Sequence, residues 1–304
     1  MSELVKAVAE ARRNFMDLVA EVRPELHRYC ARMTGSVFDG EDIVQDTLAK
    51  AYYALAELES VPPLRPWLFR IAHNTAIDFL RRYDQRFLDP LAEVAESSLA
   101  AEPELDGTRV EAALQRFTAL PPLQRSALAL KEVLGYSLEE TAVVMGTSVP
   151  AVKAALVRAR ANLARANPPS NEPVELAELG RLRRYADLFN ARDWEGLSQL
   201  FGEETQLDVV SREQRRGRAA TKYFTYYAKL APVEELRAQV GQVDGEPALA
   251  IFRAGADRQP AYFIRLEWRE GALVRVSDWR YVPYIADSAV FTPSDAMENF
   301  RSDS

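Results

Sequence analysis

Four basic side chains, with no acidic one among them, lie in residues 149–167 near the middle of the chain. They are Lys153, Arg158, Arg160 and Arg165. Thr147 or Ser148 can cap a helix here and Pro150 suits its first turn, which predicts one helix over this range. A helix whose only charged side chains are lysine and arginine can bind DNA phosphates, while its first residues contact the edges of nucleotide bases in the major groove. A solvated basic helix on an ordinary bundle would have the same composition, and Arg165 could only complement the helix dipole.

The residues before this helix have the pattern of a tight turn between two helices. Ser137 and Glu140 have the spacing of a capping box, which marks the start of a first helix. Ala142, Gly146 and Val152 then supply the small, glycine and aliphatic positions that two crossing helices require when a tight turn joins them. The pattern predicts a helix-turn-helix, and the basic second helix adds the prediction that it binds DNA.

Two more sets of polar residues fall on helices of the N-terminal part. Asp42, Gln45 and Asp46 stand at i, i+3 and i+4, so they share one polar helix face. The second set lies on one flank of a later helix: Asn74, Asp78, Arg81 and Arg82. A groove that holds an unpaired base needs phosphate-binding arginines and polar readers of the base edge. A solvated helix face fits the first set equally well, and in the second Asp78 could only orient Arg81 or Arg82.

Side chains for acid–base, nucleophilic or metal chemistry are scarce. Both histidines, His27 and His73, lie in the N-terminal part, and with the single Cys30 they do not supply the ligands of a structural zinc site. The C-terminal part offers only carboxylates, such as Asp208 and Asp278. A buried aspartate has a raised pKa and can act as a base, although a hydrogen-bonded structural role is the simpler interpretation. We therefore expect no catalytic residues, no metal and no cofactor.

The composition of the chain is that of an ordinary globular protein. With 304 residues, 48% of them hydrophobic and 27% charged, two or three compact domains are expected rather than a disordered or disulfide-rich chain. No apolar run approaches the roughly 20 residues that span a bilayer, and the N-terminus lacks the apolar core of a secretory signal. A single cysteine fits a reducing cytoplasm, which is the expected location, with no membrane partner.

Two stretches rich in proline or in acids divide the chain. The predicted order is a helical domain over 1–88, an acidic linker over 89–108, a helix-turn-helix domain over 109–167, a linker over 168–173 and a last domain over 174–304. The net charge of −7 argues against a nucleic-acid partner, but residues 110–167 carry seven bases and four acids, a net charge of +3. A basic domain thus lies within an acidic protein.

Hydrophobic periodicity predicts the helices that position the N-terminal residues. An apolar stripe over 15–33 predicts a first helix, with a kink or a new helix start at Pro24 and an end at Gly35. Further helices are expected after residue 39 or 40 and after Pro66. On these helices Trp67 and Phe69 are expected in the core, and His73 as a helix residue with satisfied hydrogen bonds.

The C-terminal domain changes in character. A helix over 176–190 is followed by runs typical of strands, at 236–243, 247–254, 260–269 and 272–282. The sequence Arg-Glu-Gly between the last two runs is a hairpin signal. Helices followed by antiparallel strands predict an α+β domain.

The two helical parts together resemble a known family. Residues 120–163 resemble region four, the promoter −35-binding domain, of extracytoplasmic-function (ECF) RNA polymerase sigma factors, through LPPLQRSALALKEVLGYSLEETAVVMGTSVPAVKAALVRARANL. Residues 40–55 (GEDIVQDTLAKAYYAL) and 66–82 (PWLFRIAHNTAIDFLRR) resemble region two of the same group, in the same order as in the family. The resemblance implies two all-α sigma domains, a region two helical bundle and a region four helix-turn-helix.

The resemblance also implies roles for the polar residues. In the family, the face that Asp42, Gln45 and Asp46 share contacts the clamp helices of the largest subunit of core RNA polymerase. The later region two helix and its loop engage the melted −10 strand, which implies −10 contacts by Asn74, Asp78, Arg81 and Arg82. In the family, the recognition helix and the turn before it bind the −35 element, which implies −35 contacts by Thr147, Ser148, Ala151, Lys153, Arg158 and Arg160.

One string departs from the family pattern. Many members carry Gly-Thr-Val-Lys-Ser-Arg at the start of the recognition helix, where this chain has PAVKAA at 150–155. Two potential polar contacts are lost, since alanine can touch a thymine methyl group but forms no hydrogen bond with a base. The alanine-rich version resembles sigma factors that carry an extra C-terminal domain.

The C-terminal domain resembles, more loosely, the SnoaL-like domain of the nuclear-transport-factor superfamily. FNARDWEGLSQLF (189–201), RRGRAATKYFTYYAKL (215–230) and closing strands near two tryptophans carry this resemblance. It implies an α+β cone, in which a curved antiparallel sheet wraps around helices and forms a pocket. The residues expected at a possible small-ligand pocket are Tyr185, Trp194, Tyr227, Trp268, Asp278 and Trp279.

The favoured hypothesis is a sigma factor that binds core RNA polymerase, directs promoter-specific transcription initiation and is regulated in cis by its C-terminal domain. It predicts no enzymatic activity and promoter DNA as a partner. Two alternatives stay open: an enzyme or small-ligand sensor on the SnoaL-like fold with a sigma-derived DNA-binding part, and a plain helix-turn-helix regulator that acts without polymerase.

Overall fold

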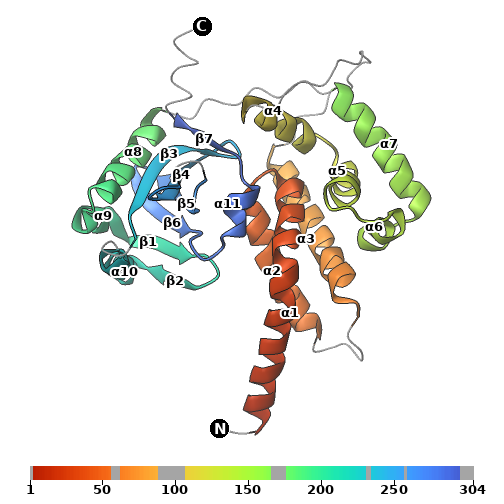
Figure 1. The fold of residues 1–304 in the computed structure, drawn as a ribbon, viewed down its shortest axis with the longest axis horizontal. Helices are drawn as coiled ribbons and strands as arrows, with labels where there is room; N and C mark the ends of the chain where they lie inside the picture. The colour runs from red at the N-terminus through yellow and green to blue at the C-terminus, as the bar shows by residue number, and fades with distance from the viewer. Residues whose placement is uncertain are drawn as a thin grey trace. The chain divides into compact units, whose positions relative to one another are not determined.

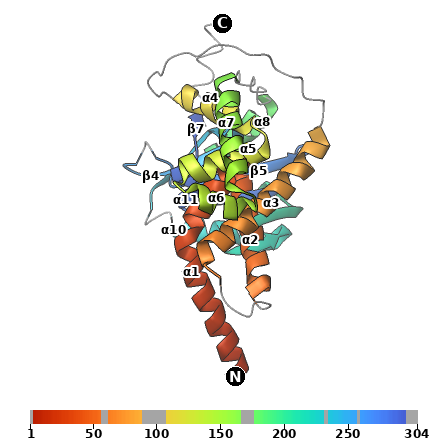
Figure 2. The ribbon, with the colours of Figure 1, turned by 90° about the vertical axis from the view of Figure 1, so that its right-hand side faces the viewer.

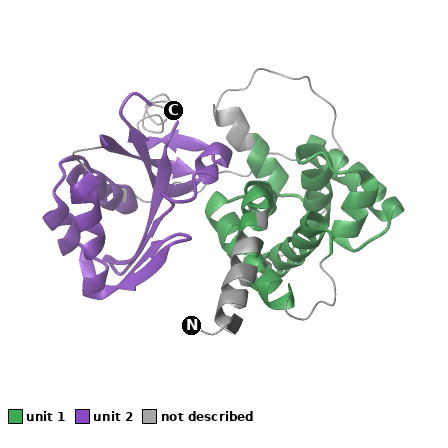
Figure 3. Cartoon of the chain, turned by 60° about the horizontal axis from the view of Figure 1, so that its bottom comes forward, with its two compact units in different colours: residues 1–169 green, residues 170–304 purple. Residues whose placement is uncertain are grey.

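The chain divides into two compact units, residues 1–169 and 170–304 (Figure 3). The structure, a computed structural model, describes residues 3–55, 62–87, 107–165, 176–230, 234–256 and 259–294. The first unit is helical and the second combines helices with a sheet, so the predicted class, all-α followed by α+β, is confirmed. The predicted linkers fall almost entirely outside the described residues, and the finer domain boundaries stay predictions.

The N-terminal part of the first unit consists of three helices, α1 (Glu3–Thr34), α2 (Val37–Leu55) and α3 (Leu64–Phe87) (Figure 1). Helix α1 runs through Pro24 without a break, so a new helix start at this residue is a wrong prediction. A proline costs a helix about 3 kcal/mol. Leu26 and Tyr29 just beyond it are completely buried, and their packing outweighs that cost. Gly35 ends the helix as predicted, with a left-handed φ of +85°.

Helices α2 and α3 begin earlier than the sequence predicts. The side chain of Ser36 accepts a hydrogen bond from the backbone N–H of Asp39 at 3.3 Å, so it caps α2 ahead of Val37. Helix α3 begins at Leu64, which places Pro66 within the first turn, where backbone N–H groups have no helical partner. Phe69 lies in the core as expected, and Trp67 is half-buried and packs against the same core.

The rest of the first unit is a series of short helices and one longer helix. They are α4 (Gly107–Thr118), α5 (Pro122–Leu128), a π-helical turn (Ala129–Val133), α6 (Leu138–Met145) and α7 (Val149–Arg165). Two parts distant in sequence share one core, because Leu130, Tyr136 and Val144 belong to the same buried cluster as Leu26 and Phe69. Helix α6 packs against α3 (Figure 2). The helix-turn-helix therefore lies on the N-terminal bundle within one compact unit.

The second unit begins with α8 (Leu176–Asn190) and α9 (Trp194–Gln199). Its other elements are β1 (Phe201–Val209), β2 (Glu213–Arg216), a 3-10 turn (Gly217–Ala219), α10 (Lys222–Leu230), β3 (Leu236–Val243), β4 (Glu246–Arg253), β5 (Tyr262–Arg269), β6 (Ala272–Asp278), α11 (Tyr284–Ser288) and β7 (Phe291–Pro293). The strands form one sheet in the order β2-β1-β6-β5-β4-β3-β7. The first helix and the four predicted strands are confirmed, although β6 ends at Asp278.

Strands β3 to β6 pair antiparallel in sequence order, whereas β1 joins β6 in parallel. The β5–β6 hairpin turns at Glu270 and Gly271, both with positive φ, of 51° and 82°. Helices α8, α9 and α10 pack against one face of the sheet, which curves around them (Figure 1). This arrangement is the α+β cone that the resemblance implies, except that the sheet contains one parallel pair, β1 with β6.

Gly40 permits the close crossing of α1 and α2. A Cβ atom at this position would lie 2.6 Å from the backbone N and 2.7 Å from the Cα of Ala31. We expect Gly40→Ala to lower the free energy of unfolding of the first unit by about 1–3 kcal/mol, because backbone must move to relieve the overlap. Native-state hydrogen exchange of the α1 and α2 amides measures this loss.

Gly180→Ala is the matched control, since a Cβ there meets no atom within 4 Å and Gly180 lies inside α8. It should stabilise its helix by about 0.5–1 kcal/mol. Unchanged protection of α1 and α2 in Gly40→Ala would contradict the role assigned to this glycine.

Candidate nucleic-acid interface

Helices α6 and α7 form the predicted helix-turn-helix, with a bend of 97° between them. The side chain of Ser137 accepts a hydrogen bond from the Glu140 N–H at 3.0 Å, and Glu140 accepts one from the Ser137 N–H at 2.8 Å. The predicted capping box is thereby confirmed. Gly146 ends α6 in a left-handed conformation with φ of +62°, and the N–H of Thr147 bonds to the carbonyl of Ala142 at 3.0 Å.

The polar face of α7 is exposed. Val152, Leu156 and Ala159 are buried against α5, which leaves the opposite face of the helix in solvent. All six residues predicted to contact −35 DNA are exposed: Thr147, Ser148, Ala151, Lys153, Arg158 and Arg160. The Ser148 hydroxyl also accepts a hydrogen bond from the Ala151 N–H at 3.4 Å, so it caps α7.

The basic side chains of α7 differ in whether they form an ion pair. Arg160 is paired with Glu132 of the π-helical turn at 2.5 Å. Lys153 and Arg158 form no ion pair with any of the described residues. A phosphate contact by Arg160 has to compete with Glu132, whereas Lys153 and Arg158 can bind a phosphate at no such cost. An exposed pair of this kind contributes about 0–1 kcal/mol, so the competition is weak but measurable.

The second predicted DNA-contact set lies on α3. Asn74, Asp78, Arg81 and Arg82 are all exposed. The carboxylate of Asp78 is 3.9 Å from Arg81, and its backbone carbonyl accepts a hydrogen bond from Arg82 at 3.2 Å. Asp78 therefore contacts both arginines, in agreement with an orienting role, while both guanidinium groups stay in solvent.

The polar face predicted on α2 is also in solvent. Asp42, Gln45 and Asp46 are exposed, but their neighbour Glu41 is completely buried and forms an ion pair with Arg23 of α1. Sequence reasoning missed Glu41, because nothing in the string GEDIVQD distinguishes a buried acid from exposed ones. The buried pair fixes α2 on α1 and so sets which residues of α2 face outward.

A buried polar network joins the helix-turn-helix part to the N-terminal bundle. The Tyr29 hydroxyl lies 2.9 Å from Nδ1 of His73 and 2.8 Å from the Ser126 hydroxyl, and Ser126 lies 3.0 Å from the same nitrogen. Burial, helped by the charge of Arg70, lowers the pKa of His73 to about 4, so the imidazole is neutral at pH 7. The satisfied role expected for His73 is confirmed.

Arg125 of α5 is the second polar link in this interface. Its guanidinium donates to the backbone carbonyls of Met33 near the end of α1, of Thr118 at the end of α4 and of Leu120 just after α4. The residue is 7% exposed. A cation suits these carbonyls, because the negative ends of helix dipoles lie there. Sequence reasoning missed Arg125, since its signal is that of any surface arginine.

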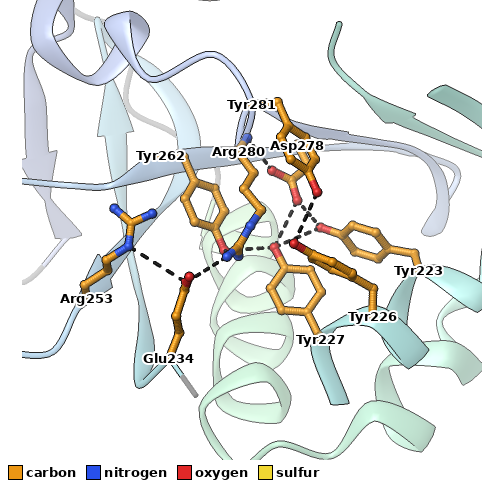
Figure 4. A network of polar contacts seen from close by, with 9 residues as sticks. All are labelled: Tyr223, Tyr226, Tyr227, Glu234, Arg253, Tyr262, Asp278, Arg280 and Tyr281. Carbon is orange, nitrogen blue, oxygen red and sulfur yellow. Dashed lines mark hydrogen bonds and ion pairs between the residues drawn. The ribbon is translucent and has the colours of Figure 1, made fainter. Parts of the chain in front are cut away.

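In the second unit, Asp278 is completely buried and fully hydrogen-bonded (Figure 4). Its carboxylate accepts bonds from the hydroxyls of Tyr223 and, at 2.9 Å, of Tyr227, and from the N–H of Arg280 at 2.7 Å. Burial raises the pKa of Asp278, and these bonds partly offset the rise. Arg280 then donates to Tyr262 at 3.0 Å. The network supports the structural interpretation of Asp278 over the catalytic one.

The residues predicted at a ligand pocket lie in or beside the core of the second unit, and a pocket formed by them stays a prediction. Tyr185, Trp194 and Tyr227 belong to the core under the helices, where Tyr185 and Tyr227 are almost completely buried. Trp279, 4% exposed, follows Asp278 at the end of β6. Trp268 lines a cavity between α8 and the β5–β6 hairpin.

The described residues hold neither a metal cluster nor a single membrane-spanning helix. They contain no group of three His, Cys, Asp or Glu side chains placed to hold a metal ion. Within the same ranges no single helix has the length and apolar composition of a membrane span. The bent pair α6–α7 reaches that length and composition only when its two helices are taken together.

Comparison with known proteins accounts for the first unit. Two family models match it, Sigma-70 region 2 over residues 18–86 and Sigma-70, region 4 over residues 111–163. ECF RNA polymerase sigma factor SigM of Mycobacterium tuberculosis is 32% identical over 165 residues, which cover 54% of this chain and 83% of SigM. The chain belongs to the ECF group of RNA polymerase sigma factors. The resemblance predicted from its motifs is confirmed.

The similarity to one relative extends past the matched models. ECF RNA polymerase sigma factor SigG of Mycobacterium tuberculosis is 32% identical over 228 residues, 64% of this chain and 61% of SigG. This sigma factor thus spans less than two thirds of SigG. A SnoaL-like protein of unknown function from Burkholderia thailandensis has a similar structure, with 15% identity and a TM-score of 0.28, over 36% of this chain and 98% of that chain.

Tyr223→Phe tests the Asp278 network of this sigma factor. The raised pKa means that the folded state binds more protons than the unfolded one above the ordinary aspartate pKa, so stability falls as pH rises through that window. Removing a phenol donor raises the pKa further. We expect Tyr223→Phe to lose about 1–3 kcal/mol of unfolding free energy at pH 8 and less at pH 5. Urea unfolding followed by tryptophan fluorescence reports this, because three of four tryptophans lie in the second unit.

The control is Tyr226→Phe, which removes a surface hydrogen bond of 3.2 Å to the Tyr281 hydroxyl. It should change stability little at either pH. Equal losses for Tyr223→Phe at both values would show that the Asp278 charge does not depend on this donor.

Proposed function

We propose that this sigma factor binds core RNA polymerase and directs promoter-specific transcription initiation in the cytoplasm, without enzymatic activity of its own. The observation that carries the proposal is the exposed face of α7, where Lys153 and Arg158 are solvent-exposed and form no ion pair with the described residues, directly after a capped helix-turn-helix. Membership of the ECF group supports the same function.

Each exposed set has a proposed partner. Asp42, Gln45 and Asp46 on α2 would contact the clamp helices of the largest polymerase subunit. The set on α3 would engage the melted −10 strand, with Arg81 and Arg82 on phosphates. The set on the turn and α7 would bind the −35 duplex, with Ala151 against a thymine methyl group.

The shared core limits what the compact first unit can reach. By their names, the −10 and −35 elements are about 25 base pairs apart, or about 85 Å at 3.4 Å per pair. A compact unit of this length has a radius of gyration of about 15 Å and is about 40 Å across. We propose that the contact between α3 and α6 opens when polymerase and promoter are bound.

Regulation in cis would act on the equilibrium between the compact first unit and the opened one. The C-terminal unit would control initiation by favouring either the compact or the open arrangement, and a small ligand bound to it would act only by preferring one of them. The hydrogen bonds of the buried Asp278 favour a structural role for this carboxylate, which weakens the case for it as the base of the enzyme alternative.

Run-off transcription with bacterial core polymerase and a library of random promoter fragments tests the function. The full chain should yield transcripts, and Asp42→Ala combined with Gln45→Ala should weaken polymerase binding and transcription together. Asp17→Ala on α1 is the control, since Asp17 is also an exposed acid. No transcript from any fragment, with either the full chain or residues 1–167 alone, would refute the assignment. Unchanged polymerase binding by the double variant would favour a plain DNA-binding regulator.

The ion pair of Arg160 sharpens the −35 prediction. Lys153→Ala or Arg158→Ala should weaken binding to all duplexes and reduce the slope of log affinity against log salt by about 1 each. Arg160→Ala should change the slope less, because Glu132 already offsets its charge. Fluorescence anisotropy across a salt series measures this, and an equal change in all three variants would overturn the distinction.

A further inference from the structure

The second unit contains a cavity of ≈ 610 Å³ between α8, the start of β1 and the β5–β6 hairpin. Leu200, Leu273 and Val274 form its apolar walls. The volume is within the range of about 300–1,000 Å³ that suits a small molecule. No residue of the hydrogen-bonded Asp278 network lines this cavity, so it is a separate feature of the domain.

One wall of the cavity carries two cations. Arg181 and Arg184 are three residues apart on α8, so they point from the same helix face. The Arg181 guanidinium lies over the ring of Trp268, 5.6 Å from its centroid. Neither arginine forms an ion pair with a described residue. The Nε atom of Arg181 and the Nε1 atom of Trp268 are buried, and within the same part of the chain neither has a hydrogen-bond acceptor.

The acids of the cavity neutralise these cations only in part. Glu203 and Glu204 lie at the start of β1 and also line the cavity. Both are exposed, and Glu204 forms an ion pair with Arg216 of β2, whereas Glu203 forms none with a described residue. Two guanidinium groups therefore face one remaining carboxylate. The excess is one positive charge beside an indole ring and aliphatic side chains.

We propose that this cavity binds a small organic acid, with an aromatic or otherwise apolar body and a single anionic head. The head would pair with Arg184 and Arg181, and the body would lie against Trp268, Leu273 and Val274. The spare donors of Arg181 and Trp268 offer hydrogen bonds that an anion can accept. The proposal goes beyond the transcription function and does not rest on it, because binding is measured without polymerase.

The test uses two fluorescent probes on the full chain, which differ in charge but share an apolar body. 8-Anilino-1-naphthalenesulfonate carries one anionic group, and N-phenyl-1-naphthylamine carries none. The anionic probe should bind saturably at one site per chain and quench tryptophan fluorescence. Arg184→Gln should weaken its binding about 10-fold or more, since hydrogen bonds to charged groups are worth about 1.5–3 kcal/mol. Binding of the uncharged probe should change less than about two-fold, because it makes no such bond.

Two more variants make the result decisive. Glu203→Gln removes the opposing charge and should tighten binding of the anionic probe, whereas Arg183→Gln, on the same helix but not lining the cavity, should leave it unchanged. Arg184 is exposed, so its variant should fold, and far-UV circular dichroism checks this. Equal affinity of the anionic probe for the wild type, Arg184→Gln and Glu203→Gln would overturn the proposal, and so would equal binding of both probes.

Discussion

The guanidinium of Arg125, bound to the backbone carbonyls at the ends of α1 and α4, is the interaction on which the first unit depends. With the Tyr29–His73–Ser126 network it fixes the helix-turn-helix part on the N-terminal bundle. A buried cation is costly to leave without partners but is readily solvated by water. The hydrogen bonds of Arg125 therefore make the closed interface specific. When the interface opens, water can solvate the guanidinium, so the newly exposed surface is not wholly apolar.

This constraint organises the proposed function. The compact unit keeps every candidate contact residue of α2, α3 and α7 in solvent, so closure does not work by covering them. In the proposed function closure would act through distance, since two candidate DNA-binding faces on one core about 40 Å across cannot reach promoter elements about 85 Å apart. In the proposed function, the C-terminal unit would bias this equilibrium between the compact and the open first unit.

The sequence predicted what local interactions determine and missed what tertiary packing determines. The capping box of Ser137 and Glu140 is local, and it places the helix-turn-helix correctly. The alternative of a new helix start at Pro24 is wrong because distant packing keeps α1 continuous. Strand β1 gives little sequence signal because its first half, FGEE, is mostly exposed and ends in two acids. Aromatic residues of a core and of a pocket look alike in a sequence, so only Trp268 of the predicted set lines the cavity. Arg125 gave no sequence signal at all.

Single-molecule energy transfer between dyes on α2 and α6 tests the central claim, that the shared core must open. Tyr53→Cys and Val143→Cys provide two exposed sites outside the proposed contact sets, and the native Cys30 is completely buried and so protected from the dyes. The account predicts efficient transfer in the free protein and its loss in the complex with core polymerase and promoter DNA. Efficient transfer that persists in a complex able to make transcripts would contradict it.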